Sequence, residues 1–289
     1  MRWCVCLLVL LLGGLLPLAT VAEEVRSEIA GFGISAKLQI ASDEREVIYL
    51  VLHGTWAHNE MEIVRALQDG LSERSQSSIA PNLSLGVDSR RGFLPCASSM
   101  APNYEHAVLE LKHWVDYLRE EGWQSIVLVG HSRGGAQVTL FQLRYNEPLV
   151  RSMALLAPMV WREAEAAAQY ERVSTVSLPQ VLSTAQQSTA SNIGPFRLLQ
   201  CDAVSAPAST FQSYYDASIP KNTALMLQQV SIPVQVFAGS DDAIAQWSDA
   251  ERAQLSNKQN IQYLEIEGAD HFFRDLYLDD VLDLMLSED

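Results

Sequence analysis

A single serine flanked by glycines, directly after a run of β-forming residues, constrains the fold of this chain more than any other feature. Residues 125–137 read SIVLVGHSRGGAQ, with Ser132 near the centre. Glycine is costly inside regular structure because it loses more conformational freedom on folding than any other residue. Gly130 and Gly134 therefore predict a sharp strand-to-helix turn in which side chains on either side of the serine would collide. Gly135 then lets the new helix pack closely.

Such a turn has a chemical consequence for the serine. It raises Oγ above the carboxyl end of the strand, beside a helix N-terminus whose N–H groups favour developing negative charge. Residues 130–134, GHSRG, match the G-x-S-x-G pattern of a nucleophile elbow. The alternative is an incidental glycine-rich turn. A serine hydroxyl is a weak nucleophile, so Ser132 needs a base, and that base needs an orienting carboxylate.

The histidines offer one well-placed base. Beyond residue 22 they are His53, His58, His106, His113, His131 and His271. His106 and His113 lie along a predicted helix, and we interpret His53 as a structural hydrogen-bonding residue. His271 follows the last predicted strand, in EGADHFF, where a base can meet the elbow from a neighbouring strand end. We therefore predict His271 as the base.

The carboxylate is expected directly after the penultimate strand. Asp241 and Asp242 lie there, in VFAGSDDAI. The chain order serine, aspartate, histidine is typical of elbow-type hydrolases and differs from the orders in chymotrypsin and subtilisin. Through VIYLVLHGTW (47–56), GHSRGG (130–135), IPVQVFAGSDD (232–242) and GADHFF (268–273), the chain resembles the α/β-hydrolase fold family. The resemblance extends from about residue 47 to the C-terminus, apart from residues 161–229.

This resemblance implies roles for several residues. In the family the acid commonly falls three residues after the glycine that ends the strand, which implies Asp242, with Asp241 as the alternative. The oxyanion hole is expected to use the backbone N–H of Arg133, the residue after the nucleophile. The second donor is implied in the loop HGTW, at Thr55 or alternatively Trp56. That loop lacks the HGGG pattern of some lipases, so it selects no lipase subtype.

The alternation of predicted strands and helices gives the fold class. It predicts an α/β fold with a mostly parallel sheet and helices on both faces. Between residues 161 and 229 this alternation stops, and the sequence is rich in alanine, serine and glutamine and is interrupted by prolines. A loop of that length is unusual inside a compact domain, so we predict an inserted helical cap. The core then comprises residues 23–160 and 230–289, and we expect the cap to carry the substrate preference.

Residues 1–22 have the layout of a secretory signal peptide. One arginine precedes a leucine-rich run, a proline and small residues, with cleavage expected after Ala22. The alternative is an uncleaved anchor. We therefore expect an exported protein, periplasmic or secreted, without stable membrane association after cleavage. Export leaves Cys96 and Cys201 in an oxidising compartment, and we predict one disulfide between them that ties the loop after VDSRRG (87–92) to the cap. The alternative is two unrelated buried thiols.

Composition excludes several other classes. The net charge of −15, from 35 acidic and 20 basic residues, argues against nucleic acid or an anionic membrane as a partner. The chain has no phosphate-binding loop, no H-E-x-x-H motif and no clustered Cys/His metal site, so we expect no cofactor and no metal.

Together these features predict a serine hydrolase that cleaves a carboxylic ester of a small-molecule acyl substrate through an acyl-enzyme. The same triad could serve a thioesterase, a peptidase or an acyltransferase. A non-catalytic binding protein that keeps the fold is the alternative from another class. The oligomeric state is not indicated by the sequence.

Overall fold

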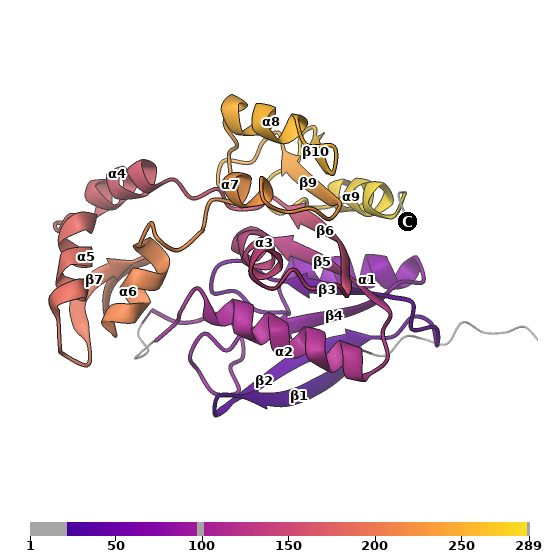
Figure 1. Ribbon diagram of the computed structural model, residues 1–289, viewed down its shortest axis with the longest axis horizontal. Helices are drawn as coiled ribbons and strands as arrows, with labels where there is room; N and C mark the ends of the chain where they lie inside the picture. The colour runs from indigo at the N-terminus through magenta and orange to yellow at the C-terminus, as the bar shows by residue number, and fades with distance from the viewer. Residues whose placement is uncertain (1–21, 97–100, 288–289) are drawn as a thin grey trace, which may run out of the picture.

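A central eight-stranded sheet organises the protein, in a computed structural model that describes residues 22–96 and 101–287 (Figure 1). The strand order is β1-β2-β4-β3-β5-β6-β9-β10. Only β1 and β2 introduce antiparallel pairs; from β4 to β10 every neighbouring pair is parallel. The strands are β1 (Glu23–Ile29), β2 (Phe32–Gln39), β3 (Val47–Leu52), β4 (Ser77–Asn82), β5 (Ser125–His131), β6 (Val150–Leu156), β9 (Val234–Gly239) and β10 (Ile261–Ile266). The predicted fold class is therefore confirmed.

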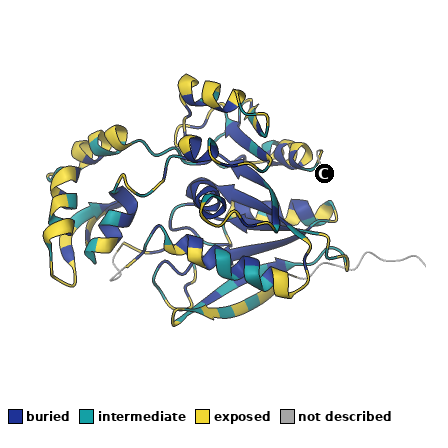
Figure 2. Cartoon of the chain, in the orientation of Figure 1, coloured by how far each residue is buried: buried dark blue, intermediate teal, exposed yellow. Residues whose placement is uncertain are grey.

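Helices cover both faces of this sheet because the central strands are apolar on both sides. In β3, Ile48 and Leu50 pack on one face, whereas Tyr49 and Val51 pack on the other. The first face is covered by α2, α3 and α8 and the second by α1 and α9. Figure 2 shows the central strands as buried, whereas the edge strand β1 is intermediate to exposed. These helices are α1 (Glu62–Glu73), α2 (His106–Glu120), α3 (Arg133–Tyr145), α8 (Asp249–Ser256) and α9 (Leu276–Leu286).

The segment between β6 and β9 lies mostly in a lobe beside the core, at the left of Figure 1, and its last helix lies against the core. Its elements are α4 (Glu163–Val173), α5 (Leu178–Gln187), β7 (Ile193–Leu198), β8 (Cys201–Ala206), α6 (Ala208–Tyr215) and α7 (Thr223–Leu227). The expected short helices are present, but β7 and β8 add an antiparallel hairpin that we did not predict. Helix α7 packs against α3 and α8 of the core. The predicted cap bounds, residues 161 and 229, stay a prediction.

The hairpin was missed because its turn carries no typical turn residue. Leu199 takes a positive φ of 54° at the bend, a position usually occupied by glycine or asparagine. The one local signal is Gly194, where a Cβ would lie 2.4 Å from the carbonyl oxygen of Val204 on the partner strand. A glycine inside a strand often marks such a close backbone approach.

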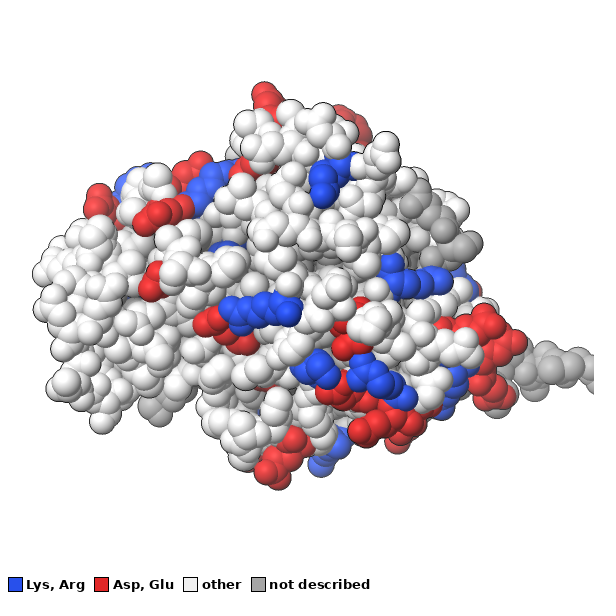
Figure 3. All heavy atoms as spheres, viewed as in Figure 1, with Lys and Arg blue, Asp and Glu red and all other residues white. Residues whose placement is uncertain are grey.

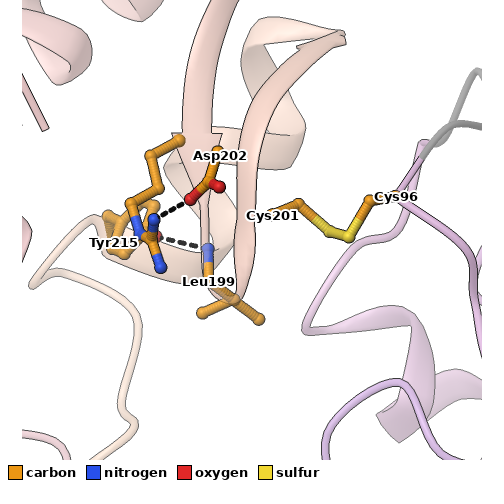
Figure 4. Close-up of a disulfide and its surroundings, with 6 residues drawn as sticks. Cys96, Leu199, Cys201, Asp202 and Tyr215 are labelled. Atoms are coloured by element: carbon orange, nitrogen blue, oxygen red, sulfur yellow. Dashed lines mark hydrogen bonds and ion pairs between the residues drawn. A yellow bond between two sulfur atoms is a disulfide. The ribbon is translucent and has the colours of Figure 1, made fainter. Parts of the chain in front are cut away.

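A disulfide joins Cys96 to Cys201, the first residue of β8, and thereby ties the cap to the loop that follows β4 (Figure 4). The pairing expected from the sequence is confirmed. In residues 23–289, denatured without reductant, we expect no titratable thiol, and after reduction we expect two. Two free thiols without reductant would contradict the pairing. With a sequence separation of 105 between the cysteines, the chain-entropy estimate gives a stabilisation of about 4–5 kcal/mol, so reduction should lower the denaturation midpoint.

The predicted signal peptide, residues 1–22, lies outside the described residues except for Ala22. Within the described part of the chain, no helix combines the length and apolar character needed to cross a bilayer. The same described residues contain no cluster of His, Cys, Asp and Glu suited to a metal ion. On the face shown in Figure 3, acidic and basic side chains intermingle around α2, and those of the cap gather along its upper edge, near α4.

Candidate active site

The elbow lies where β5 meets α3, and its backbone is strained as the sequence predicts. Ser132 has φ of 56° and ψ of −121°, a conformation that non-glycine residues adopt at an energetic cost. A Cβ on Gly130 would lie 2.6 Å from the Cα of Gly135 and 2.8 Å from the carbonyl carbon of Gly134. Glycine is therefore required at position 130 because the chain folds back on itself around the serine.

The requirement at Gly134 has a different source, which the sequence did not show. A Cβ there would lie 2.6 Å from the carbonyl oxygen of Leu52 and 2.5 Å from that of His53, both at the end of β3. At Gly135 a Cβ would lie 2.8 Å from the Cβ of Pro158, after β6. The first turn of α3 therefore packs closely against the end of β3 and the residue that follows β6, which leaves no room for side chains at these two glycines.

His271 and Asp242 meet at the carboxyl edge of the sheet, on the loops after β10 and β9. The distance from Nδ1 of His271 to Oδ2 of Asp242 is 2.8 Å, and both side chains are buried. The two loops can approach because Gly239 ends β9: a Cβ there would lie 2.3 Å from the carbonyl oxygen of Ala269. Asp241, the alternative acid, is exposed, and its carboxylate contacts only the neighbouring Ser240 hydroxyl among the described residues.

The second oxygen of Asp242 is held by the backbone. Oδ1 accepts hydrogen bonds from the N–H groups of Ile244, at 2.6 Å, and Ala245, at 2.9 Å. Burial alone would raise the pKa of Asp242, but the hydrogen bonds from His271 and these two N–H groups outweigh it and lower the pKa. The carboxylate is therefore ionised at neutral pH and fixed in orientation, as a partner of an imidazole must be.

Ser132 and His271 line the same pocket, whose volume is about 280 Å³. Most of its wall is apolar, and the lining residues are His53, Gly54, Thr55, Ala57, Met61, Ile63, Val64, Phe93, His131, Ser132, Met159, Ile244, His271 and Phe272. None of them belongs to residues 161–229, so the predicted cap, which we expected to carry the substrate preference, contributes no lining residue to this pocket. A second pocket of about 300 Å³ shares Met61, Ile63 and Phe272 with it.

The two residues expected to supply the oxyanion hole lie together. Nε of Arg133 donates a hydrogen bond of 3.0 Å to Oγ1 of Thr55. Within the described part of the chain, neither backbone N–H of this pair has a hydrogen-bond acceptor. The side chain of Trp56, the alternative donor, is fully buried, and its indole N–H donates to the hydroxyl of Tyr214 in the cap. Tyr214 carried no signal in the sequence because its contact spans 158 positions.

Two further histidines near the serine are structural. Nδ1 of His53 is 3.0 Å from the carbonyl oxygen of Gly54, and its Nε2 accepts from the N–H of Leu83. Nε2 of His131 lies 2.9 Å from the backbone oxygen of His271 and so supports the loop that carries the predicted base. Burial is the main cause that lowers the pKa of His53 to about 3 and that of His131 to about 4.

These two histidines predict acid sensitivity of the fold. The folded protein keeps both neutral, whereas the unfolded chain protonates them below about pH 6.5. Unfolding therefore takes up protons as the pH falls from about 6.5 to about 4 for His131 and to about 3 for His53. Stability should be constant above this window and drop within it, by up to about 1.4 kcal/mol per pH unit for each histidine. Urea denaturation between pH 7.5 and 4.5 measures the slope.

A matched pair of variants assigns that slope. His131→Asn should remove about half of it, while His106→Gln, which changes an exposed histidine, should leave it unchanged. A free energy of unfolding that is equal at pH 7.5 and pH 5 in the unmodified protein would contradict the prediction.

Comparison with solved structures agrees with this architecture. The chain is similar to Est1E from Butyrivibrio proteoclasticus, with a TM-score of 0.63, 15% sequence identity, and coverage of 92% of this chain and 98% of that one. It is similar to an alpha-beta serine hydrolase homologue from Coxiella burnetii, with a TM-score of 0.57 and 15% identity over 92% and 97% of the two chains. The thioesterase domain from the curacin biosynthetic pathway gives a TM-score of 0.57 and 16% identity over 92% and 100%. At these identities the likeness shows the fold alone.

Two sequence comparisons complete the assignment. A comparison with curated proteins gives no match. A protein-family profile described as "Alpha/beta hydrolase family" matches residues 49–284, which include the elbow, both aspartates after β9 and the histidine after β10. Because the profile spans most of the chain, the protein belongs to the α/β-hydrolase family.

Proposed function

We propose that the protein is a serine hydrolase that cleaves carboxylic esters of small molecules through an acyl-enzyme. One arrangement carries the proposal: the buried 2.8 Å contact between His271 and Asp242, with His271 and Ser132 lining one pocket. A nucleophile at an elbow, an imidazole and an ionised carboxylate are the groups that acyl transfer needs.

Each residue has a step in this reaction. Oγ of Ser132 attacks the carbonyl carbon while Nε2 of His271 takes the hydroxyl proton, and Asp242 stabilises the imidazolium. His271 then gives that proton to the departing alcohol. A water molecule, deprotonated by the same imidazole, attacks the acyl-enzyme and releases the acid. The backbone N–H groups of Thr55 and Arg133 stabilise the oxyanion during both acylation and deacylation. We favour Thr55 over Trp56 as the second donor because Thr55 lines the pocket.

The lining of the pocket supports an apolar group next to the scissile bond. Met61, Ile63, Val64 and Phe272 surround the space beside Ser132 and leave few polar partners for a hydrophilic acyl chain. A structural neighbour, Est1E, has been solved with ferulic acid bound, which supports a small-molecule substrate. We propose esters of aliphatic or aromatic acids as the substrate class.

We also propose that the protein is exported. The N-terminal segment has the layout of a signal peptide, and a disulfide joins Cys96 and Cys201, a pairing that persists in oxidising compartments.

A substrate panel tests the proposal. Residues 23–289 are purified with the disulfide intact and incubated with p-nitrophenyl esters of graded acyl length, a matched thioester and a matched anilide. We expect ester hydrolysis to be fastest. Faster thioester cleavage would assign a thioesterase, and anilide cleavage a peptidase. No turnover with any substrate, in a folded protein, would favour a binding protein.

A further inference from the structure

The turn that carries Thr55 and Trp56 contains, like the elbow, a non-glycine residue with a positive φ. Trp56 has a φ of 50°, in the left-handed region that bulky residues rarely adopt. Such a conformation persists only when surrounding contacts hold it in place. The backbone N–H of Thr55 immediately precedes this residue, so contacts that hold Trp56 also hold the oxyanion donor.

One contact that holds Trp56 comes from the cap. Its indole Nε1 donates a 2.9 Å hydrogen bond to the hydroxyl of Tyr214 on α6, and the two rings meet edge to face with centroids 5.9 Å apart. Both side chains are about 1% exposed. From the core side, the carbonyl oxygen of Trp56 accepts from the N–H of Leu94, in the loop that leads to Cys96. The turn is therefore held between the cap and the disulfide-bearing loop.

Tyr214 also reaches the other proposed donor. The guanidinium of Arg133 lies over the Tyr214 ring, 5.4 Å from its centroid, and Nε of Arg133 donates to Thr55. The contacts therefore close a ring, from Tyr214 to Trp56, along the chain to Thr55, across to Arg133 and back to Tyr214. Both residues whose N–H groups would bind the oxyanion belong to this ring.

We propose that Tyr214 is a positioning residue that fixes the oxyanion hole from the cap, although α6 does not line the pocket. This inference rests on the proposed function. Removing the hydroxyl leaves the indole N–H of Trp56 buried without an acceptor, and relaxation of the strained turn relieves that cost. The fraction of protein molecules in which the Thr55 N–H is placed to bind the oxyanion then falls.

The experiment compares two tyrosines that follow each other on α6. Tyr214→Phe removes the hydroxyl and keeps the ring. Tyr215→Phe is the matched control, because its hydroxyl accepts a 2.7 Å hydrogen bond from the N–H of Leu199 entirely within the cap (Figure 4). Each variant loses one hydrogen bond, so a general loss of cap stability should affect both. Helix α6 keeps a separate link to the core in either variant, since Ser213 Oγ accepts from the N–H of Tyr104.

We expect Tyr214→Phe to lower kcat for the best ester by about fivefold to tenfold, with KM changed less than about twofold. Inhibition by phenylboronic acid, whose tetrahedral serine adduct places an oxygen in the oxyanion hole, should weaken by a similar factor. Tyr215→Phe should retain kcat and inhibitor affinity. In a Trp56→Phe background the Tyr214→Phe change should lower kcat no further, because the indole N–H that the hydroxyl satisfies is already absent.

The outcomes are distinguishable. An unmodified protein that neither hydrolyses esters nor binds the boronic acid overturns the proposed function and this inference with it. If the unmodified protein hydrolyses esters but Tyr214→Phe has an unchanged kcat, only the role of Tyr214 is overturned. The same holds if Tyr214→Phe and Tyr215→Phe lose kcat equally. A change in KM without a change in kcat does the same.

Discussion

Replacing Ser132 by alanine should lower kcat for every accepted ester by about 10⁶-fold, because the attacking oxygen is lost and the remaining groups cannot replace it. The variant should stay folded. The Ser132 side chain makes no capping hydrogen bond to α3, although the residue occupies the N-cap position, so its hydroxyl is not needed to start the helix. Steady-state kinetics, with circular dichroism as the folding control, measures both expectations.

Covalent labelling tests the same atom independently of the choice of substrate. A fluorophosphonate should modify the unmodified protein once, at Ser132, and should leave Ser132→Ala unlabelled. Labelling of His271→Ala should be much slower, because the hydroxyl then lacks its base. If the probe modified a different serine, or if Ser132→Ala kept its activity, the assignment of the nucleophile would be wrong.

The second large effect is expected at the carboxylate. Asp242→Asn should lower kcat by about 10⁴-fold while the fold is retained. The amide oxygen can still accept from the backbone N–H groups of Ile244 and Ala245, which leaves the NH₂ group facing Nδ1 of His271. Because NH₂ donates and cannot accept, the imidazole is driven to the tautomer whose Nε2 carries a proton. In that tautomer it cannot deprotonate the serine.

The neighbouring aspartate provides the control. Asp241→Asn makes the same chemical change one residue away, at an exposed side chain that does not contact the imidazole. It should keep kcat within about twofold, as is usual for surface substitutions. A large loss in Asp241→Asn with little loss in Asp242→Asn would transfer the role to Asp241.

Local chemistry explains why much of this protein could be predicted. The elbow depends on residues adjacent in sequence, so its glycines are readable without knowledge of the rest of the fold. Strand β3, VIYLVL, is a continuous hydrophobic run and is buried at every position after Val47, and such a run predicts a parallel sheet covered by helices on both faces. Once the sheet is parallel, strand ends share one edge, which explains why His271 and Ser132 line one pocket.

Contacts between distant segments decided the rest. Which aspartate meets the imidazole depends on how the turn after Gly239 directs two adjacent side chains. The family resemblance implied Asp242, but the local sequence by itself left Asp241 as the alternative. The hairpin in the cap, the β3 carbonyls that exclude a side chain at Gly134, and the hydrogen bond between Trp56 and Tyr214 join residues far apart in the chain. No local pattern encodes such pairings, because each depends on the distance between elements after packing. The sequence by itself determined the elbow and the sheet, whereas the tertiary structure decided what surrounds them.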